Sequence, residues 1–94
     1  MDIEHNIREL RDQIDAIDDS ILHLLSERFI ATREIGRIKA DGGMPAQSPN
    51  REAEQFDRLA SLAKGLNVDP DLVQAIYRLL IDTVIDEHRD QKSS

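Results

Sequence analysis

The chain has 94 residues, of which 39% are hydrophobic and 33% charged, and its formal net charge is −7. It contains no cysteine, which excludes disulfides, thiolate metal sites and thiol nucleophiles, and the acidic balance argues against nucleic acids and anionic membranes as partners. The N-terminus lacks the features of a signal peptide, and no apolar run approaches the roughly 18 residues of a membrane span. We therefore expect one cytoplasmic domain over residues 1–94.

The first element is predicted to be one long helix over about residues 6–40. Apolar side chains recur at steps of 3 and 4, as in a coiled-coil seam, at Ile7, Leu10, Ile14, Ile17, Ile21 and Leu24. Gly42 and Gly43 then follow Asp41 and can adopt the left-handed conformation that ends many helices.

A shorter helix is predicted over residues 49–64, with Ser48 as its N-cap, Pro49 at its first position and Gly65 at its end. Its inner face is formed by Glu52, Phe56, Leu59 and Ala63. A medium helix over about residues 70–90 opens with the same signal, Asp69-Pro70. Its apolar stripe is formed by Val73, Ile76, Tyr77, Leu80 and Val84. The fold class is therefore all-α.

The length of the first helix predicts a homodimer. About 35 residues at about 1.5 Å each give about 50 Å, whereas a compact domain of this size is roughly 30 Å across. Two shorter helices cannot cover a seam that runs almost the whole length. We expect a second copy to cover it, with the long helices paired about a twofold axis.

Three polar residues occupy positions where these apolar patterns need carbon: Arg28, Glu52 and His88. A buried charge is costly unless it is paired or binds a ligand. Each residue also has a simpler interpretation. Arg28 would cover apolar surface with its stem or pair with an acidic neighbour, Glu52 would lie on the surface or pair with Arg28, and His88 would be solvated at a frayed helix end.

The spacing of the cations favours a small anionic ligand. Arg28 and Lys39 point within about 20° of each other and lie about 16 Å apart along the helix. Arg11 is about 25 Å from Arg28 and turned away by about 100°, so one chain cannot bring both to the same small ligand. In an antiparallel pair of long helices, Arg11 of the partner subunit reaches the region of Arg28 and Lys39. Three cations would then surround one pocket in an acidic protein.

Four stretches of the chain resemble the all-helical (AroQ-type) chorismate mutases, with the spacing between them preserved. They are residues 10–18 (LRDQIDAID), 25–28 (LSER), 35–39 (IGRIK) and 50–52 (NRE), and the resemblance covers about residues 7–89. It implies an intertwined helical dimer with two shared active sites. It also implies an isomerase that converts chorismate to prephenate in the biosynthesis of phenylalanine and tyrosine.

The resemblance also implies roles for individual residues. Arg28, together with Arg11 of the partner subunit, would bind the two substrate carboxylates. Lys39 would hydrogen-bond the ether oxygen of the breaking bond. Glu52 would contact the ring hydroxyl and orient Lys39, with Arg51 in support.

Three positions depart from the family pattern: Ser48 replaces a carboxylate, Val84 a small hydroxyl residue, and His88 a glutamine. Ser48 keeps a hydrogen-bonding group if capping does not use it, and His88 can donate from a neutral or a protonated ring. Val84 cannot donate, although Thr83 is adjacent.

The implied reaction is a unimolecular rearrangement, so we expect no metal and no cofactor. Two alternatives share the fold. One is an isochorismate pyruvate-lyase. The other is a catalytically weak dimerisation or regulatory module that partners another enzyme of aromatic biosynthesis.

Overall fold

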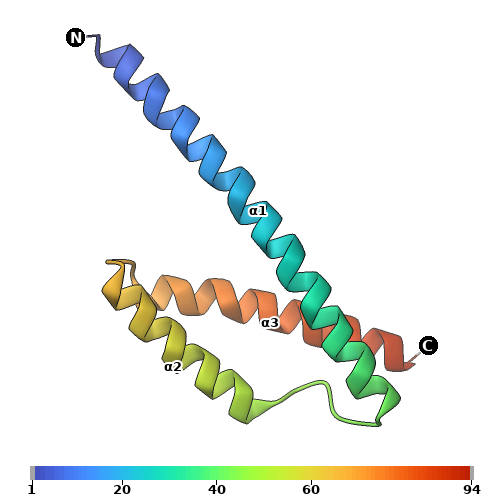
Figure 1. Cartoon of the computed structure of the whole chain (residues 1–94). Coiled ribbons are helices and arrows are strands. Elements are labelled where there is room, and N and C mark those ends of the chain that lie inside the picture. The colour runs from blue at the N-terminus through green and yellow to red at the C-terminus, as the bar shows by residue number, and fades with distance from the viewer. Residues whose placement is uncertain (1, 94) are drawn as a thin grey trace. The chain divides into compact units, whose positions relative to one another are not determined.

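A computed structural model describes the backbone of residues 2–93 and the side chains of residues 2–89. Its helices are α1 (Ile3–Asp41), α2 (Pro49–Gly65) and α3 (Pro70–Ser93), and the described residues contain no strand (Figure 1). The predicted all-α class and the order of long, short and medium helices are confirmed. None of the helices described here is long and apolar enough to cross a membrane. The chain divides after Thr32 into two units.

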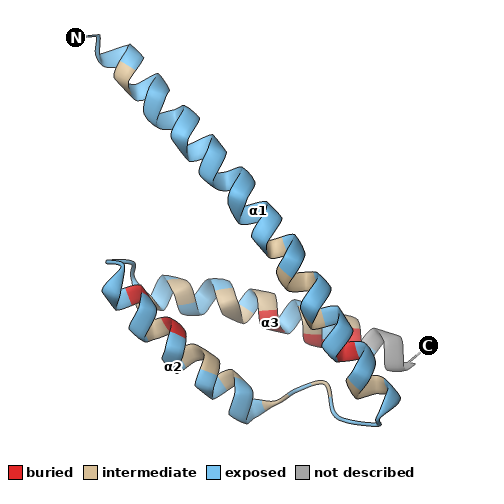
Figure 2. Cartoon of the chain, in the orientation of Figure 1, coloured by how far each residue is buried: buried red, intermediate tan, exposed pale blue. Residues whose placement is uncertain are grey.

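The first unit consists of α1 up to Thr32, and its predicted seam is exposed. The side chains of Leu10, Ile14 and Ile17 are 57%, 54% and 57% exposed. Figure 2 shows this stretch of α1 almost entirely in the colour of exposed residues. The periodic apolar face therefore exists as the sequence predicts, and nothing within this unit buries it.

The second unit runs from Arg33 onward, and its core lies where α2 packs against α3. The buried apolar side chains among its described residues are Leu59 and Ala63 from α2 and Ile81 and Ile85 from α3 (Figure 2). The predicted inner face of α2 is confirmed, since Leu59 and Ala63 belong to it.

The predicted stripe of α3 is wrong in one respect. Ile76 is 46% exposed, whereas Ile81 and Ile85, which the prediction omitted, are buried. At 100° per residue, Ile76 lies about 180° around the helix from Ile85. The sequence offers apolar residues on both sides of α3, and only the packing of the helices decides which side is buried.

Helices α2 and α3 begin at the predicted signals, but the two caps differ. Pro49 and Pro70 are the first helical residues. The Asp69 carboxylate accepts a hydrogen bond from the backbone N–H of Asp71 at 2.9 Å, as an N-cap does. Ser48 is the N-cap of α2 by position, yet its hydroxyl makes no capping hydrogen bond.

Helix α1 ends in a Schellman motif at the predicted glycines. Gly43 has φ +69°, a left-handed conformation that a residue without Cβ adopts freely. The N–H of Met44 donates to the carbonyl of Lys39 at 2.8 Å, and the N–H of Gly43 to that of Ala40 at 3.2 Å. The chain turns sharply out of the helix as a result.

Helix α2 ends in the same motif, but not at a glycine. Its last residue is Gly65, one position beyond the predicted end, whereas the left-handed residue is Asn67, with φ +59°. The N–H of Val68 donates to the carbonyl of Ala63 at 2.8 Å, and that of Asn67 to Lys64 at 3.3 Å. Asparagine is the residue after glycine that most readily takes this conformation.

We expect Asn67→Ala to lower the free energy of unfolding by about 1 kcal/mol, because alanine does not tolerate a left-handed conformation well. Asn67→Gly should leave stability unchanged or raise it slightly. Urea unfolding of both variants measures the difference. Equal stability of the alanine and glycine variants would contradict this account of the α2 terminus.

Candidate functional site

The predicted site residues are distributed over both units. Arg11 and Arg28 lie on the part of α1 that forms the first unit, where Arg11 is exposed and Arg28 is half-buried. The remaining six, Lys39, Ser48, Arg51, Glu52, Val84 and His88, belong to the second unit. The second unit therefore carries most of the predicted site.

Lys39 lies in the last turn of α1 and is tied to the loop that follows. Its ammonium group donates to the carbonyl of Ala46 at 3.4 Å, and its own carbonyl accepts from Met44. Lys39 is half-buried. An ammonium has three donors, so further donors remain for a ligand.

The start of α2 places Ser48 and Arg51 differently. Ser48 is half-buried and its hydroxyl is not used in capping, so it is available to a ligand. Arg51 is exposed and its guanidinium lies 3.9 Å from the carboxylate of Glu54, which is a weak surface ion pair.

Glu52 is the least exposed carboxylate among the ion pairs of the described residues, with 14% of its side chain accessible. Its Oε1 is buried and has no hydrogen-bond partner in the part of the chain described. The nearest cation to it is Nη1 of Arg78 on α3, at 3.6 Å, which is an ion pair longer than a hydrogen bond. Within the second unit, the cation that pairs with Glu52 is thus Arg78.

His88 is buried, at 4% exposure, so the interpretation that it is solvated at a frayed helix end is wrong. Its imidazole lies against Gly36 of α1: a Cβ built on that glycine would be 3.3 Å from Nδ1. Its other nitrogen, Nε2, is buried without a hydrogen-bond partner among the described residues. A side chain at position 36 would occupy the space that the ring uses.

An ion pair holds the same two helix segments together beside His88. The guanidinium of Arg33 on α1 donates to both carboxylate oxygens of Glu87 on α3, at 3.2 and 3.3 Å. These hydrogen bonds raise the pKa of the Arg33 guanidinium. The two-point contact joins the last turns of α1 to α3 at the surface.

Val84 is half-buried on the inner side of α3. The adjacent hydroxyl does not replace the missing donor, because Thr83 is exposed and its hydroxyl donates to the carbonyl of Leu79 at 2.7 Å. Position 84 therefore offers a ligand an apolar side chain, with no donor from Thr83 beside it.

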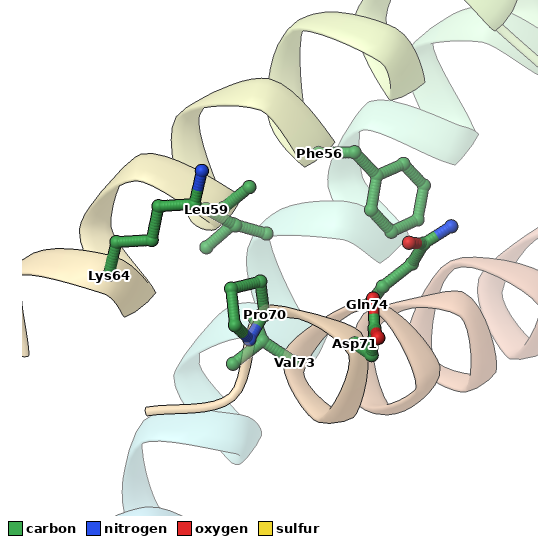
Figure 3. Close-up of a pocket in the computed structure, with 8 residues that line it drawn as sticks. Phe56, Leu59, Lys64, Pro70, Asp71, Val73 and Gln74 are labelled. Carbon is green, nitrogen blue, oxygen red and sulfur yellow. The ribbon is translucent and has the colours of Figure 1, made fainter. Parts of the chain in front are cut away.

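A pocket of about 390 Å³ lies elsewhere, between α2 and α3 close to the turn that joins them (Figure 3). Its lining residues are Phe56, Leu59, Ala60, Lys64, Pro70, Asp71, Val73 and Gln74. None of the eight predicted site residues is among them. No group of His, Asp or Glu side chains among the described residues has the arrangement of a metal site.

Sequence reasoning missed Arg78. Its guanidinium pairs with Glu52 on α2 and, at 3.3 Å, with Asp82 one turn along its own helix. The spacing of Arg78 and Asp82 is a signal in the sequence, but it predicts only a surface pair. The contact with Glu52 depends on how α2 and α3 align, which no local pattern encodes.

Comparison with known proteins agrees with the resemblance to chorismate mutases found in the sequence. The family model for type II chorismate mutases matches residues 10–89. A chorismate mutase of Methanocaldococcus jannaschii is 37% identical over 76 residues, which cover 81% of this chain and 77% of that protein. A bifunctional chorismate mutase/prephenate dehydratase of Aquifex aeolicus is 43% identical over 83 residues, and a T-protein of Enterobacter agglomerans is 39% identical over 69 residues. The matches cover only 23% and 18% of these two longer relatives.

We expect Gly36→Ala to displace the His88 ring, because the added methyl group would approach Nδ1 to 3.3 Å. The control is Gly65→Ala, where nothing lies within 4 Å of the added Cβ. Alanine is the better helix former by about 1 kcal/mol, so the control should gain up to that much stability and Gly36→Ala less. Unfolding curves and the NMR signals of the His88 ring report both effects. Equal gains with unchanged ring signals would show that the contact is unimportant.

Proposed function

The chain belongs to the type II chorismate mutase family and is an isomerase of that kind, and we propose that it converts chorismate to prephenate at a site completed by a second copy. The match to bifunctional proteins that join a mutase to a prephenate dehydratase supports prephenate as the product. These relatives also favour an enzyme that consumes prephenate as a functional partner.

The rearrangement makes particular demands on a protein. The substrate is a dianion that reacts in its compact diaxial conformer, and negative charge develops on the ether oxygen as the bond breaks. The protein must therefore fix the two carboxylates and place donors at the ether oxygen in advance. No nucleophile is required.

The cations of this chain meet those demands. Arg28, with Arg11 of the partner subunit, binds the two carboxylates, for which the planar fork of arginine is suited. Lys39 donates to the ether oxygen from the last turn of α1, where its loop contact already limits its motion. Arg51, exposed at the rim, supports the binding of the anion.

The observation that carries the proposal is a pair of buried polar atoms without hydrogen-bond partners among the described residues, Oε1 of Glu52 and Nε2 of His88. Such atoms are costly in a protein interior and are usually satisfied by a ligand or by water. In the proposed site, Glu52 accepts from the ring hydroxyl and His88 donates to the ether oxygen. Helices α2 and α3 then each place one of these buried atoms at the substrate.

Two of the departures from the family pattern have a consequence for binding. The free hydroxyl of Ser48 contacts the ring hydroxyl in place of a carboxylate. Val84 provides no hydrogen bond, so the carboxylate nearest to it depends on arginine alone. We therefore propose a site that relies on its cations more strongly than one with a hydroxyl at position 84.

The exposed seam of α1 supports a second copy as its occupant. An isolated helix without packing partners is marginally stable in water, and α1 up to Thr32 has no other element in its unit. A regular apolar face of this kind needs a partner with the same heptad pattern, and another α1 supplies one. The proposed dimer also delivers Arg11 to the site of its partner.

The first test is incubation of the purified chain with chorismate and, separately, with isochorismate. We expect prephenate from chorismate. Formation of salicylate from isochorismate, without prephenate from chorismate, would identify the lyase alternative, and no product from either would identify a silent module.

Lys39→Ala should lower turnover at least about a hundredfold, by analogy with the removal of a donor to a developing oxyanion. The variant should still fold, because the backbone carbonyl that caps α1 is retained. Lys64→Ala, which changes the corresponding basic residue in the last turn of α2, is the matched control and should keep normal turnover. Turnover of Lys39→Ala near that of this control would remove Lys39 from the mechanism.

Mixing two inactive variants tests the shared site. Arg11→Ala and Arg28→Ala should each be nearly inactive alone. Random exchange makes half of the dimers mixed, and each mixed dimer has one intact site out of two, so the mixture should recover about a quarter of the normal activity. No recovery after exchange, verified by native mass spectrometry, would rule out a site built from two copies.

A further inference from the structure

We propose that Arg78 is a positioning residue for the Glu52 carboxylate, an inference that rests on the function proposed above. Glu52 lies on α2 with 14% of its side chain exposed, and Arg78 faces it from α3. A carboxylate in such surroundings needs a counter-charge. In the second unit, Arg78 supplies one.

The guanidinium of Arg78 is held from three directions. Glu52 contacts Nη1 at 3.6 Å, Asp82 contacts the same nitrogen at 3.3 Å, and the guanidinium carbon lies 4.8 Å from the centre of the Phe56 ring. Phe56 follows Glu52 by one helical turn on α2, and Asp82 follows Arg78 by one turn on α3. The cation therefore sits at a fixed place in the contact between the two helices, over an aromatic face that attracts it.

The length of the Glu52–Arg78 contact matters for chemistry. At 3.6 Å, the ion pair stabilises the negative charge of Glu52 without a hydrogen bond to Oε1. The lone pairs of that oxygen stay available to accept from the hydroxyl of a substrate. A shorter, bidentate pair would hold the carboxylate equally well but would occupy its acceptor sites.

Arg78 thus acts on the substrate only through Glu52. It holds the carboxylate in position, and Asp82 and Phe56 keep Arg78 in place. Lysine could not replace it fully, because an ammonium lacks the planar group that stacks on a ring while it faces two carboxylates.

A double-mutant cycle separates this role from a structural one. We expect Arg78→Gln to lower turnover about tenfold when Glu52 is present. In a Glu52→Gln background the same change should alter turnover less than about twofold, since no carboxylate is left to position. Affinity for a bicyclic transition-state analogue, measured by calorimetry, gives a second readout where turnover is too low. It should show the same pattern.

Arg58→Gln is the matched control, because it removes the same charge from an exposed position on α2 and should leave turnover unchanged. If Arg78→Gln does not fold, Arg78→Lys replaces it in the cycle. That variant should lose part of the turnover with Glu52 present and none in the Glu52→Gln background. Circular dichroism and unfolding curves establish that each variant is folded.

Equal losses in both backgrounds would overturn the proposal and leave the mutase function intact, because Arg78 would then act on the fold alone. Unchanged turnover in Arg78→Gln would also overturn it. A wild-type chain that makes no prephenate would refute the proposed function itself, and the positioning role would fall with it.

Discussion

The cost of burying polar atoms is the constraint on which the second unit depends. Between α2 and α3 the chain buries a carboxylate oxygen of Glu52, and between α1 and α3 it buries a nitrogen of His88. Neither atom has a hydrogen-bond partner among the described residues, yet the buried apolar residues of this unit include Leu59 and Ile85 on the same two helices. Apolar residues at these two positions would make a better core. The presence of Glu52 and His88 is understood if local stability is lost so that a ligand can form hydrogen bonds with their buried atoms.

Much of the fold follows from local patterns. The helix starts at Pro49 and Pro70 and the left-handed turn at Gly43 are set by residues that permit few other conformations. The failures have a common cause. The periodicity places Ile76 on the inner stripe and gives no sign of the Arg78–Glu52 contact, because both depend on the rotation of α3 against its neighbours. Periodicity gives the faces that a helix offers, whereas packing decides which of them is used.

The sequence predicts less of the candidate site than of the fold. Charge spacing along one helix led to a small anion, and only the family resemblance turned that anion into chorismate. The apolar pattern places His88 on an inner face, but it does not decide between burial and a solvated helix end, because the space for the ring depends on the absence of a side chain at Gly36, fifty-two positions away. The sequence also could not decide whether the Ser48 hydroxyl is free, since an N-cap serine ordinarily uses that group within its own helix.

The contacts of Lys39 constrain how this chain can change over evolutionary time. Connections between helices usually accept extra residues with little effect. Here one residue holds the connection twice, through its carbonyl at Met44 and its ammonium at Ala46. Insertions between Lys39 and Ala46 would change the direction in which the Lys39 ammonium points. An insertion at Gln47, beyond both contacts, would not disturb them. The function of Lys39 therefore constrains the length of this loop up to Ala46, whereas the length beyond Ala46 is less constrained.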